Sequence, residues 1–253
     1  MTVRAQTRRE KISALVARRG EVSVDEIASM FGTSHETIRR DLTRLEDSGV
    51  LLKVHGGAKP APRLLEGSFN ERMSENRDGK QVIANKLAGW LAPNQMIFMD
   101  TGSTTLIAAE AVAQVPGLQV ATNSLKIANM IASRAGGPDV FVLGGRLETD
   151  NRETVGPTTI EEIGRYNADC AIVTIGGLNG ADGASDYSYD EAQVARAMIG
   201  RAEQTVVLCD QSKFDRRAAF QVCPLAEIDV MISDAAPGVT LASALNAAGA
   251  RTL

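Results

Sequence analysis

The sequence is poor in aromatic residues and in cysteine. Only 4% of its 253 residues are Phe, Trp or Tyr, so any core must be built mainly from Ala, Val, Ile and Leu. The three cysteines, Cys170, Cys209 and Cys223, are odd in number and lack the spacing of a metal site, which argues against a disulfide framework. Because they lie in or beside apolar stretches, we expect reduced thiols in a core.

Long apolar runs are also absent. No stretch approaches the ~18 consecutive apolar residues of a membrane span, and no signal peptide is visible. The Arg-rich start, a possible transit peptide, runs directly into a helical pattern, so we expect a cytoplasmic chain without a membrane partner. Both histidines, His35 and His55, lie near the start, so we expect neither a histidine metal site nor a cofactor.

Charge is distributed unevenly along the chain. Residues 1–63 carry 12 Lys and Arg against 8 Asp and Glu, whereas the remainder carries 15 against 23. A net charge of +4 in front of a body of −8 suits a protein that presents one end to a polyanion. The length of 253 residues also favours two domains.

Three short helical patterns open the chain. The first ends at Gly20, the second begins with a capping box of Ser23 and Glu26, and the third begins at Ser34 and ends at Gly49. Apolar residues recur three or four positions apart in each pattern, as expected for one buried face per helix. In the third pattern the buried positions are Ile38, Leu42 and Leu45.

The segment after the third helix predicts a β-hairpin. Val50–Val54 is strand-like and is followed by His55-Gly56-Gly57, which reads as the turn of a wing. Pro60 and Pro62 mark the following segment as a linker. We therefore predict a winged helix-turn-helix domain at 1–57 and a linker at 58–76.

Residues 77–253 alternate between strand-like and helical patterns, which predicts an α/β fold with a mainly parallel sheet flanked by helices. A helix with Val82, Ile83, Leu87, Trp90 and Leu91 leads in. The expected strands are Met96–Met99, Leu118–Ala121, Val140–Leu143, Ala171–Ile175, Thr205–Leu208 and Val230–Ile232. The expected helices lie near Thr104–Val112, Leu125–Ser133, Thr158–Tyr166, Glu191–Ala202 and Leu241–Ala248.

The third helix is the candidate DNA-reading element. With its apolar face buried, its polar side chains are free to meet base edges and phosphates in the major groove. The competing interpretation is a three-helix bundle with a solvated Arg face, or a winged helix that binds a protein. The order of capped helices, Arg pair and Gly-rich wing favours DNA. The candidate contacts are Ser34, His35, Thr37, Arg39, Arg40 and Arg44 on the helix, with Lys53 and His55 on the wing.

Polar or Gly-rich residues follow five of the predicted strands. After the first strand, Gly102 permits a tight turn, and Ser103 to Thr105 offer hydroxyls beside the free N–H groups of a helix start, which suits a phosphate. Alone, this motif is equally an ordinary capped helix start. Because ligands bind beyond the carboxyl ends of parallel strands, the five ends together favour a binding site. The motifs are Asp100-Thr101-Gly102-Ser103-Thr104-Thr105, Thr122-Asn123-Ser124, Gly144-Gly145-Arg146, Gly176-Gly177 and Asp210-Gln211-Ser212-Lys213.

These segments resemble the DeoR family of bacterial transcriptional regulators. The resemblance is carried by Arg8, Ile12, Val16, Ser34-x-x-Thr37-Ile38-Arg39-Arg40-Asp41-Leu42 and His55-Gly56-Gly57-Ala58, and it extends to about Asp234. It implies a repressor that binds operator DNA as a homodimer or homotetramer. It also implies that Asp41 is a structural partner of neighbouring bases, since an acid facing phosphate would be repelled.

For residues 77–253 the resemblance implies a sensor of phosphorylated sugars or polyols with a fold related to ribose-5-phosphate isomerase. By position, Ser103, Thr104, Thr105 and Lys213 would hold the phosphate, while Asp100, Asn123 and Arg146 would meet hydroxyls or an acid group. The full set of candidate effector-binding residues is Asp100, Gly102, Ser103, Thr104, Thr105, Asn123, Gly145, Arg146, Gly176 and Lys213.

The alternative is a sugar-phosphate isomerase with a DNA-binding appendage. It needs a carboxylate base and an acid or Lys, and Asp100, Asp182, Asp210 and Lys213 are available by type. The acidic loops and Lys-Gly-Gly segment expected of that isomerase are not evident, and no dinucleotide fingerprint occurs. One departure from the family is the segment 186–190, Asp-Tyr-Ser-Tyr-Asp, which is similar to glycerol-3-phosphate-type members or else provides simple packing.

Overall fold

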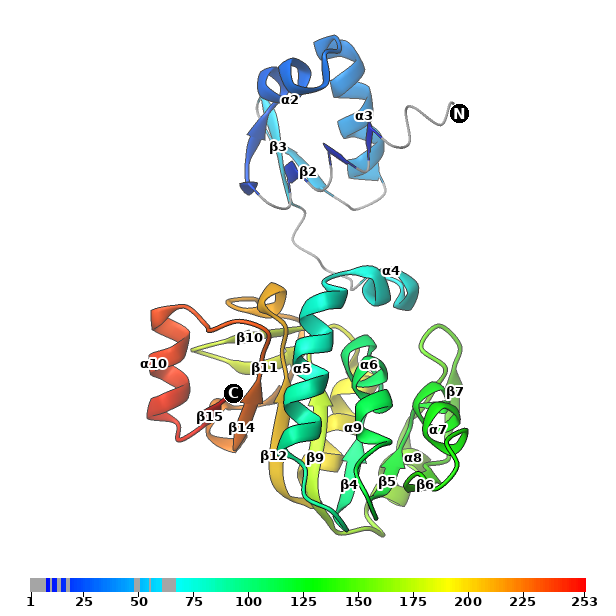
Figure 1. Cartoon of the computed structure of the whole chain (residues 1–253). Coiled ribbons are helices and arrows are strands. Elements are labelled where there is room, and N and C mark those ends of the chain that lie inside the picture. Colours follow the sequence, from blue (N-terminus) through cyan, green and yellow to red (C-terminus); the bar gives the residue numbers. More distant parts are fainter. Residues whose placement is uncertain are drawn as a thin grey trace. The chain divides into compact units, whose positions relative to one another are not determined.

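The computed structural model describes residues 8, 9, 11, 12, 15, 16, 19–47, 51–54, 56–60 and 67–253. The chain divides into two compact units, Met1–Glu66 and Gly67–Leu253. Each unit has a hydrophobic core of its own (Figure 1).

The first unit is built on helices packed through one small core. Residues 8 to 19 are helical wherever they are described, and α2 (Val24–Phe31) and α3 (His35–Asp47) follow. The capping box predicted at Ser23 is present, because the Ser23 hydroxyl accepts from the Glu26 N–H and the Glu26 carboxylate accepts from the Ser23 N–H. Buried side chains from all three helices fill the core, among them Ile12, Val16, Ile27, Ile38, Leu42 and Leu45.

A three-stranded antiparallel sheet completes this unit. Its strands are β1 (Val22–Ser23), β2 (Leu51–Val54) and β3 (Gly57–Pro60), in the order β1-β3-β2. The hairpin β2–β3 is the predicted wing. It is longer than predicted, because residues 58–60, which we assigned to the linker, pair with β2 and β1. The predicted end of α3 at Gly49 lies outside the described residues.

The second unit contains a parallel sheet of seven strands in the order β15-β14-β12-β9-β4-β5-β6. All six predicted strands are present within a few residues of the expected bounds. The strands are β4 (Met96–Met99), β5 (Gln119–Thr122), β6 (Asp139–Val142), β9 (Ala168–Thr174), β12 (Ala202–Leu208), β14 (Val230–Ile232) and β15 (Arg251–Thr252).

Helices cover both faces of this sheet. Successive residues of a strand point to opposite faces, and apolar side chains on both faces have to be buried. Ile97 and Met99 face a core shared with α5 (Arg77–Trp90), α6 (Ser103–Val112) and α7 (Leu125–Ala132). Phe98 faces the other core, shared with α8 (Pro157–Ile163), α9 (Tyr189–Ile199) and α10 (Val239–Ala247). Figure 1 shows α5 and α6 in front of the central strands and α9 behind them.

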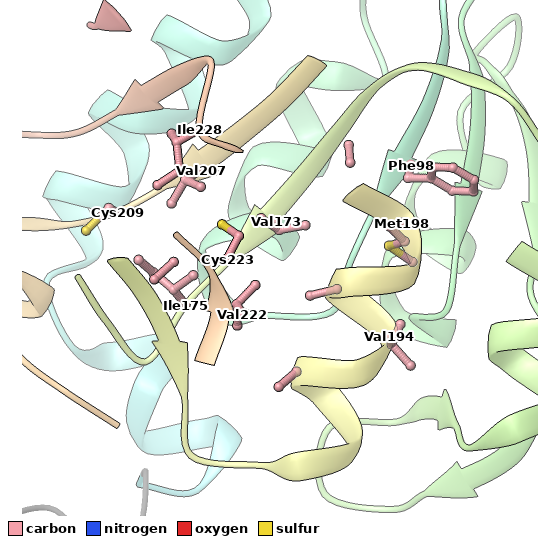
Figure 2. Close-up of a cluster of buried hydrophobic side chains, with 14 of the residues drawn as sticks. Phe98, Val173, Ile175, Val194, Met198, Val207, Cys209, Val222, Cys223 and Ile228 are labelled. Atoms are coloured by element: carbon pink, nitrogen blue, oxygen red, sulfur yellow. The ribbon is translucent and has the colours of Figure 1, made fainter. Parts of the chain in front are cut away.

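The core around Phe98 also contains two of the three cysteines. Figure 2 shows Cys209 and Cys223 among Val173, Val207 and Ile228. All three cysteines are free and buried, as expected from their apolar surroundings. Burial raises the pKa of Cys170 and of Cys223 to about 12, so these thiols stay protonated and unreactive at neutral pH.

Several short elements were not predicted. A hairpin of β7 (Arg146–Glu148) and β8 (Glu153–Val155) follows β6, and β10 (Gly177–Asn179), β11 (Gly183–Asp186) and β13 (Phe220–Cys223) form an antiparallel sheet. The helix α4 (Phe69–Ser74) lies within the predicted linker and is capped by Ser68. These elements surround the carboxyl ends of the parallel strands and supply the site residues described next. Two short 3-10 helices, Gln211–Lys213 and Leu225–Glu227, complete the unit.

Candidate DNA-binding surface and effector site

The sheet reverses its order of connection between β4 and β9. The chain runs from β4 outward through β5 to β6, and then returns to β9 before running outward through β12 to β14. A crevice forms beyond the carboxyl ends of the two strands at such a switch point, because their connections leave in opposite directions. The predicted ligand motifs after β4, β5 and β9 therefore share one edge of the sheet.

Asp100 and Thr174 join the two strands across this point. The Thr174 backbone N–H donates to both carboxylate oxygens of Asp100 at 3.1 Å, and the Thr174 hydroxyl donates to the carbonyl of Thr101 at 3.1 Å. Burial raises the pKa of Asp100 well above its ordinary value, and the neighbouring carboxylates of Asp186 and Glu153 add to the shift. The backbone N–H of Thr174 therefore holds the Asp100 carboxyl in place.

A buried lysine faces the N-terminus of α6. Lys80, on the core side of α5, is 3% exposed, and its ammonium donates to the Ser103 hydroxyl at 3.0 Å and to the carbonyl of Arg72. Burial lowers the pKa of Lys80, while Asp210 raises it and Lys213 lowers it. Lys80, Lys213 and the free N–H groups of α6 thus contribute positive potential to one place, where an anion would be stabilised.

Beside this position lies a pocket lined by four carboxylates. Two apolar side chains, Val194 and Ala195, also line it. The four carboxylates come from four different elements or loops and belong to Asp100, Glu153, Asp186 and Glu191.

Asn151 connects these carboxylates to α4. Its side-chain amide donates to Glu153 at 2.8 Å and to Glu191 at 3.2 Å, and its carbonyl oxygen accepts from the Arg72 guanidinium at 2.5 Å. Burial raises the pKa of Glu153 to about 7, although hydrogen bonds from Asn151 and Asn123 and the charge of Arg72 oppose the shift. The helix α4, which lies within the predicted linker, is therefore hydrogen-bonded to residues at the pocket.

Only some of the predicted effector residues line the pocket or contact Lys80. Asp100 and Asn123 line the pocket, and Ser103 contacts Lys80. The Thr105 hydroxyl donates to the Gly102 carbonyl within its own helix turn. A Cβ on Gly102 would collide with the Thr174 hydroxyl, so glycine there permits the close approach of the two strand ends. Thr104 is buried in the first turn of α6.

Three other predicted residues lie outside the pocket lining. Arg146 is exposed and pairs with Asp190 at 2.6 Å and with Glu148 at 3.2 Å. Gly145, with φ of 148°, packs against Thr159, so its role is in the turn that leads into β7. Gly176 packs against the ring of Tyr187, which favours simple packing for that tyrosine.

In the first unit, the predicted DNA-reading residues lie on the solvent side of α3. Ser34, His35, Arg39, Arg40 and Arg44 are exposed, whereas Ile38, Leu42 and Leu45 enter the core. The Ser34 hydroxyl accepts from the Thr37 N–H at 3.3 Å and caps the helix. The Arg40 side chain is 77% exposed and forms an (i, i+4) pair with Glu36 at 3.4 Å. Such a pair is weak, so the guanidinium is available for DNA.

Asp41 is the exception on this helix. It is 4% exposed, and it accepts from Arg8 at 2.6 Å and from Arg9 at 3.4 Å. The expected pairing of this acid with neighbouring bases is therefore present. The pairs fasten α3 to the first helix.

On the wing, Lys53 contacts the end of α3 as well as solvent. Its ammonium lies 3.4 Å from Glu46 and 3.1 Å from the Thr43 hydroxyl, and its backbone N–H donates to Glu46 at 2.9 Å. His55, the other wing residue predicted to contact DNA, lies outside the described residues.

Sequence reasoning missed Arg72, Lys80, Glu153 and Glu191. A signal existed for Lys80, which precedes Ile83 by three positions and Leu87 by seven and so occupies the apolar face of a helix. A lysine at such a position is expected to be buried, which makes it a candidate functional residue. The two glutamates gave no such signal, because only the three-dimensional fold brings their elements to the pocket.

Family profiles match both units of the chain. The DeoR-like helix-turn-helix domain matches residues 8–61, and the DeoR C terminal sensor domain matches residues 75–235. The chain belongs to the DeoR family. It is a transcriptional regulator with an N-terminal helix-turn-helix domain and a C-terminal sensor domain.

This DeoR-family chain matches curated transcriptional regulators along nearly their whole length. It is 33% identical over 228 residues to the HTH-type transcriptional regulator GlpR of Haloferax volcanii, covering 90% of this chain and 89% of the relative. It is 29% identical over 241 residues to the glycerol-3-phosphate regulon repressor of Escherichia coli, covering 95% of both. A solved ribose 5-phosphate isomerase from Methanocaldococcus jannaschii aligns with a TM-score of 0.41 and 17% identity over 55% of each chain.

No described helix is long and apolar enough to cross a membrane. Within the same residues, no three or more His, Cys, Asp or Glu side chains are grouped as ligands of a metal ion.

Proposed function

We propose that this DeoR-family chain is a repressor that binds operator DNA through α3 and the wing, and that a phosphorylated sugar or polyol releases it. The relatives named as repressors of a glycerol-3-phosphate regulon support the class of effector. The observation that carries the proposal is the buried ammonium of Lys80, 3.0 Å from Ser103 at the start of α6.

The buried position of Lys80 favours an anion. Removing an ammonium from water is costly, and in this chain the cost appears as a lowered pKa. A phosphate between Lys80, Ser103 and the N–H groups of α6 offsets that cost through charge-assisted hydrogen bonds. Lys213, which lowers the pKa of Lys80 by its charge, adds a second cation to the same place.

Effector binding is connected to the linker through α4. Lys80 donates to the carbonyl of Arg72, and Arg72 donates to Asn151 beside the pocket. A ligand that competes for either donor changes the position of α4 (Phe69–Ser74), which lies within the predicted linker. The effector releases DNA if it binds more tightly to the arrangement that cannot contact the operator.

The test uses the full chain with glycerol 3-phosphate and with hexose monophosphates. We expect one of them to raise the melting temperature and to weaken operator binding, and unphosphorylated glycerol or hexose to have no effect. Lys80→Met and Ser103→Ala should abolish the response. Lys86→Met is the matched control, because Lys86 lies on the same helix and donates to the Ser233 carbonyl instead. An equal response to the unphosphorylated compounds would remove the phosphate site.

We propose further that the site binds its ligand without converting it. The isomerase alternative predicts interconversion of aldose and ketose phosphates, which NMR spectra of the incubated ligand would show. We also propose that the chain acts as a homodimer or homotetramer, since paired half-sites require paired recognition helices. Light scattering with and without operator DNA tests the assembly, and a monomer bound to DNA would contradict it.

A further inference from the structure

The carboxylate pocket is rich in hydrogen-bond acceptors and poor in free donors. The side-chain amide of Asn123 already donates to Glu153 and to the Thr154 carbonyl, both at 3.1 Å. The Thr174 hydroxyl donates to the Thr101 carbonyl. The side chains that line the pocket therefore offer a ligand mainly oxygen atoms that accept.

Two buried polar atoms in the lining lack a partner among the described residues. They are the carbonyl oxygen of the Asn123 side chain, whose residue is 1% exposed, and the hydroxyl of Thr101, whose residue is 4% exposed. A buried polar atom without a hydrogen bond is costly, so such atoms in a pocket indicate the place of a ligand group. An amide oxygen can only accept, and it therefore requires a donor on the ligand.

The charge of the pocket lining also favours a ligand group that donates hydrogen bonds. Asp100, Glu153, Asp186 and Glu191 line it, and no Lys, Arg or His stands among the lining residues. Arg72 reaches this group through the neutral side chain of Asn151. Burial raises the pKa of both Asp100 and Glu153, and the charge of Asp186 adds to both shifts. The carboxylates are not grouped as metal ligands within the described residues.

The two ends of the site therefore differ in sign. Asp100 and Thr101 lie in the pocket lining, while Ser103, two residues further on, contacts Lys80. We propose that the carboxylate pocket binds the end of the effector that lies away from the phosphate, accepts hydrogen bonds from its hydroxyl groups, and excludes a second acid group. This inference rests on the proposed phosphate site. It restricts the effector to monophosphates of neutral sugars or polyols, and excludes bisphosphates and phosphorylated sugar acids.

Three matched pairs of compounds test the inference on the full chain by calorimetric titration at about pH 8. They are glycerol 3-phosphate with 3-phosphoglycerate, glucose 6-phosphate with 6-phosphogluconate, and fructose 6-phosphate with fructose 1,6-bisphosphate. Because buried like charges oppose binding strongly, we expect the neutral member of any pair that binds to have a Kd about a hundredfold lower. Equal Kd values within a binding pair would overturn the inference and leave the phosphate site intact. Failure of all six compounds would overturn both.

A variant shows whether the carboxylates cause the selection. Asp186→Asn combined with Glu191→Gln should reduce the ratio of the two Kd values by about tenfold, because the acid partner meets less negative charge. Glu161→Gln is the control, since Glu161 lies on α8, its side chain is 75% exposed, and it pairs with Arg165. Inorganic phosphate serves as a probe of the phosphate position alone, and its Kd should stay the same in both variants. An unchanged ratio in a folded double variant would overturn the inference, and the single variant Asp186→Asn replaces the double one if that does not fold.

Discussion

The two units hold their functional side chains in opposite ways. On α3 the residues proposed to meet DNA are exposed, and a separate set of apolar residues forms the core. In the sensor unit the candidate site residues Lys80, Asp100 and Asn123 are themselves buried. Changes on α3 should therefore affect binding and leave folding alone, whereas changes in the sensor should affect both.

The largest expected effect is on DNA binding. Replacing Arg39 and Arg40 together with Ala should weaken operator binding by about 2–6 kcal/mol, because each guanidinium that reads a base contributes about 1–3 kcal/mol. The melting temperature should stay the same, since both side chains are exposed. Fluorescence anisotropy with operator DNA, and a thermal melt of the same protein, measure the two quantities. Wild-type affinity in the double variant would contradict the role of α3.

Asp41 differs from the other charged residues of α3, because its side chain is buried whereas Arg39, Arg40 and Arg44 are exposed. Asp41→Ala leaves Arg8 and Arg9 without their shared partner and should lower the free energy of unfolding by about 3 kcal/mol. Chemical denaturation of the full chain, with the first unit followed by its own probe, measures this loss. Glu36→Ala on the same helix is the matched control and should change stability little, since its pair with Arg40 is exposed. A similar loss of stability in both variants would contradict a specific stabilising role for the buried Asp41 pairs.

Of the fold, the sequence predicted the parts that depend on local periodicity. The third helix was read correctly because Ile38, Leu42 and Leu45 repeat at helical spacing, and the six apolar strands were read from their composition. The hairpin β7–β8 was missed because its two strands are short and partly polar, so they show no clear alternation. Its stability depends on contacts with the end of the parallel sheet, which are distant in sequence. The same reason hid Glu153 and Asn151, whose places depend on contacts with Asn123 and Arg72. The role of Arg146 stays a prediction, since the side chain lies outside the pocket lining and pairs with Asp190 and Glu148.

The buried sensor site should respond to pH, unlike the exposed helix. Glu153 ionises near 4.5 when unfolded and at about 7 in the folded chain, so the folded state keeps a proton that the unfolded state has lost. The free energy of unfolding of the sensor unit should therefore fall by up to about 3 kcal/mol as pH rises from about 5 to about 8. Denaturation curves at several pH values measure the slope. Glu153→Gln should flatten it, and an unchanged slope would assign the titration to other groups.

The smallest expected effect is on the wing. Lys53→Ala removes an exposed pair with Glu46 and should change stability by less than about 1 kcal/mol. It should weaken binding to all DNA sequences alike. It should also make the slope of log affinity against log salt less steep by about 0.9, the value of one phosphate contact. Titrations at low and moderate salt measure that slope. A loss confined to one operator sequence would place Lys53 at a base instead.

The pairing of β4 with β9 also determines the order in which the chain can fold during synthesis. The hydrogen bond between Asp100 and Ile172 joins residues that are more than seventy positions apart, so the ligand site cannot close until β9 has left the ribosome. The first unit has a compact core of its own within its first sixty residues, and contacts that are close in sequence form fastest. We therefore expect a nascent chain to be able to hold DNA before it can sense a metabolite.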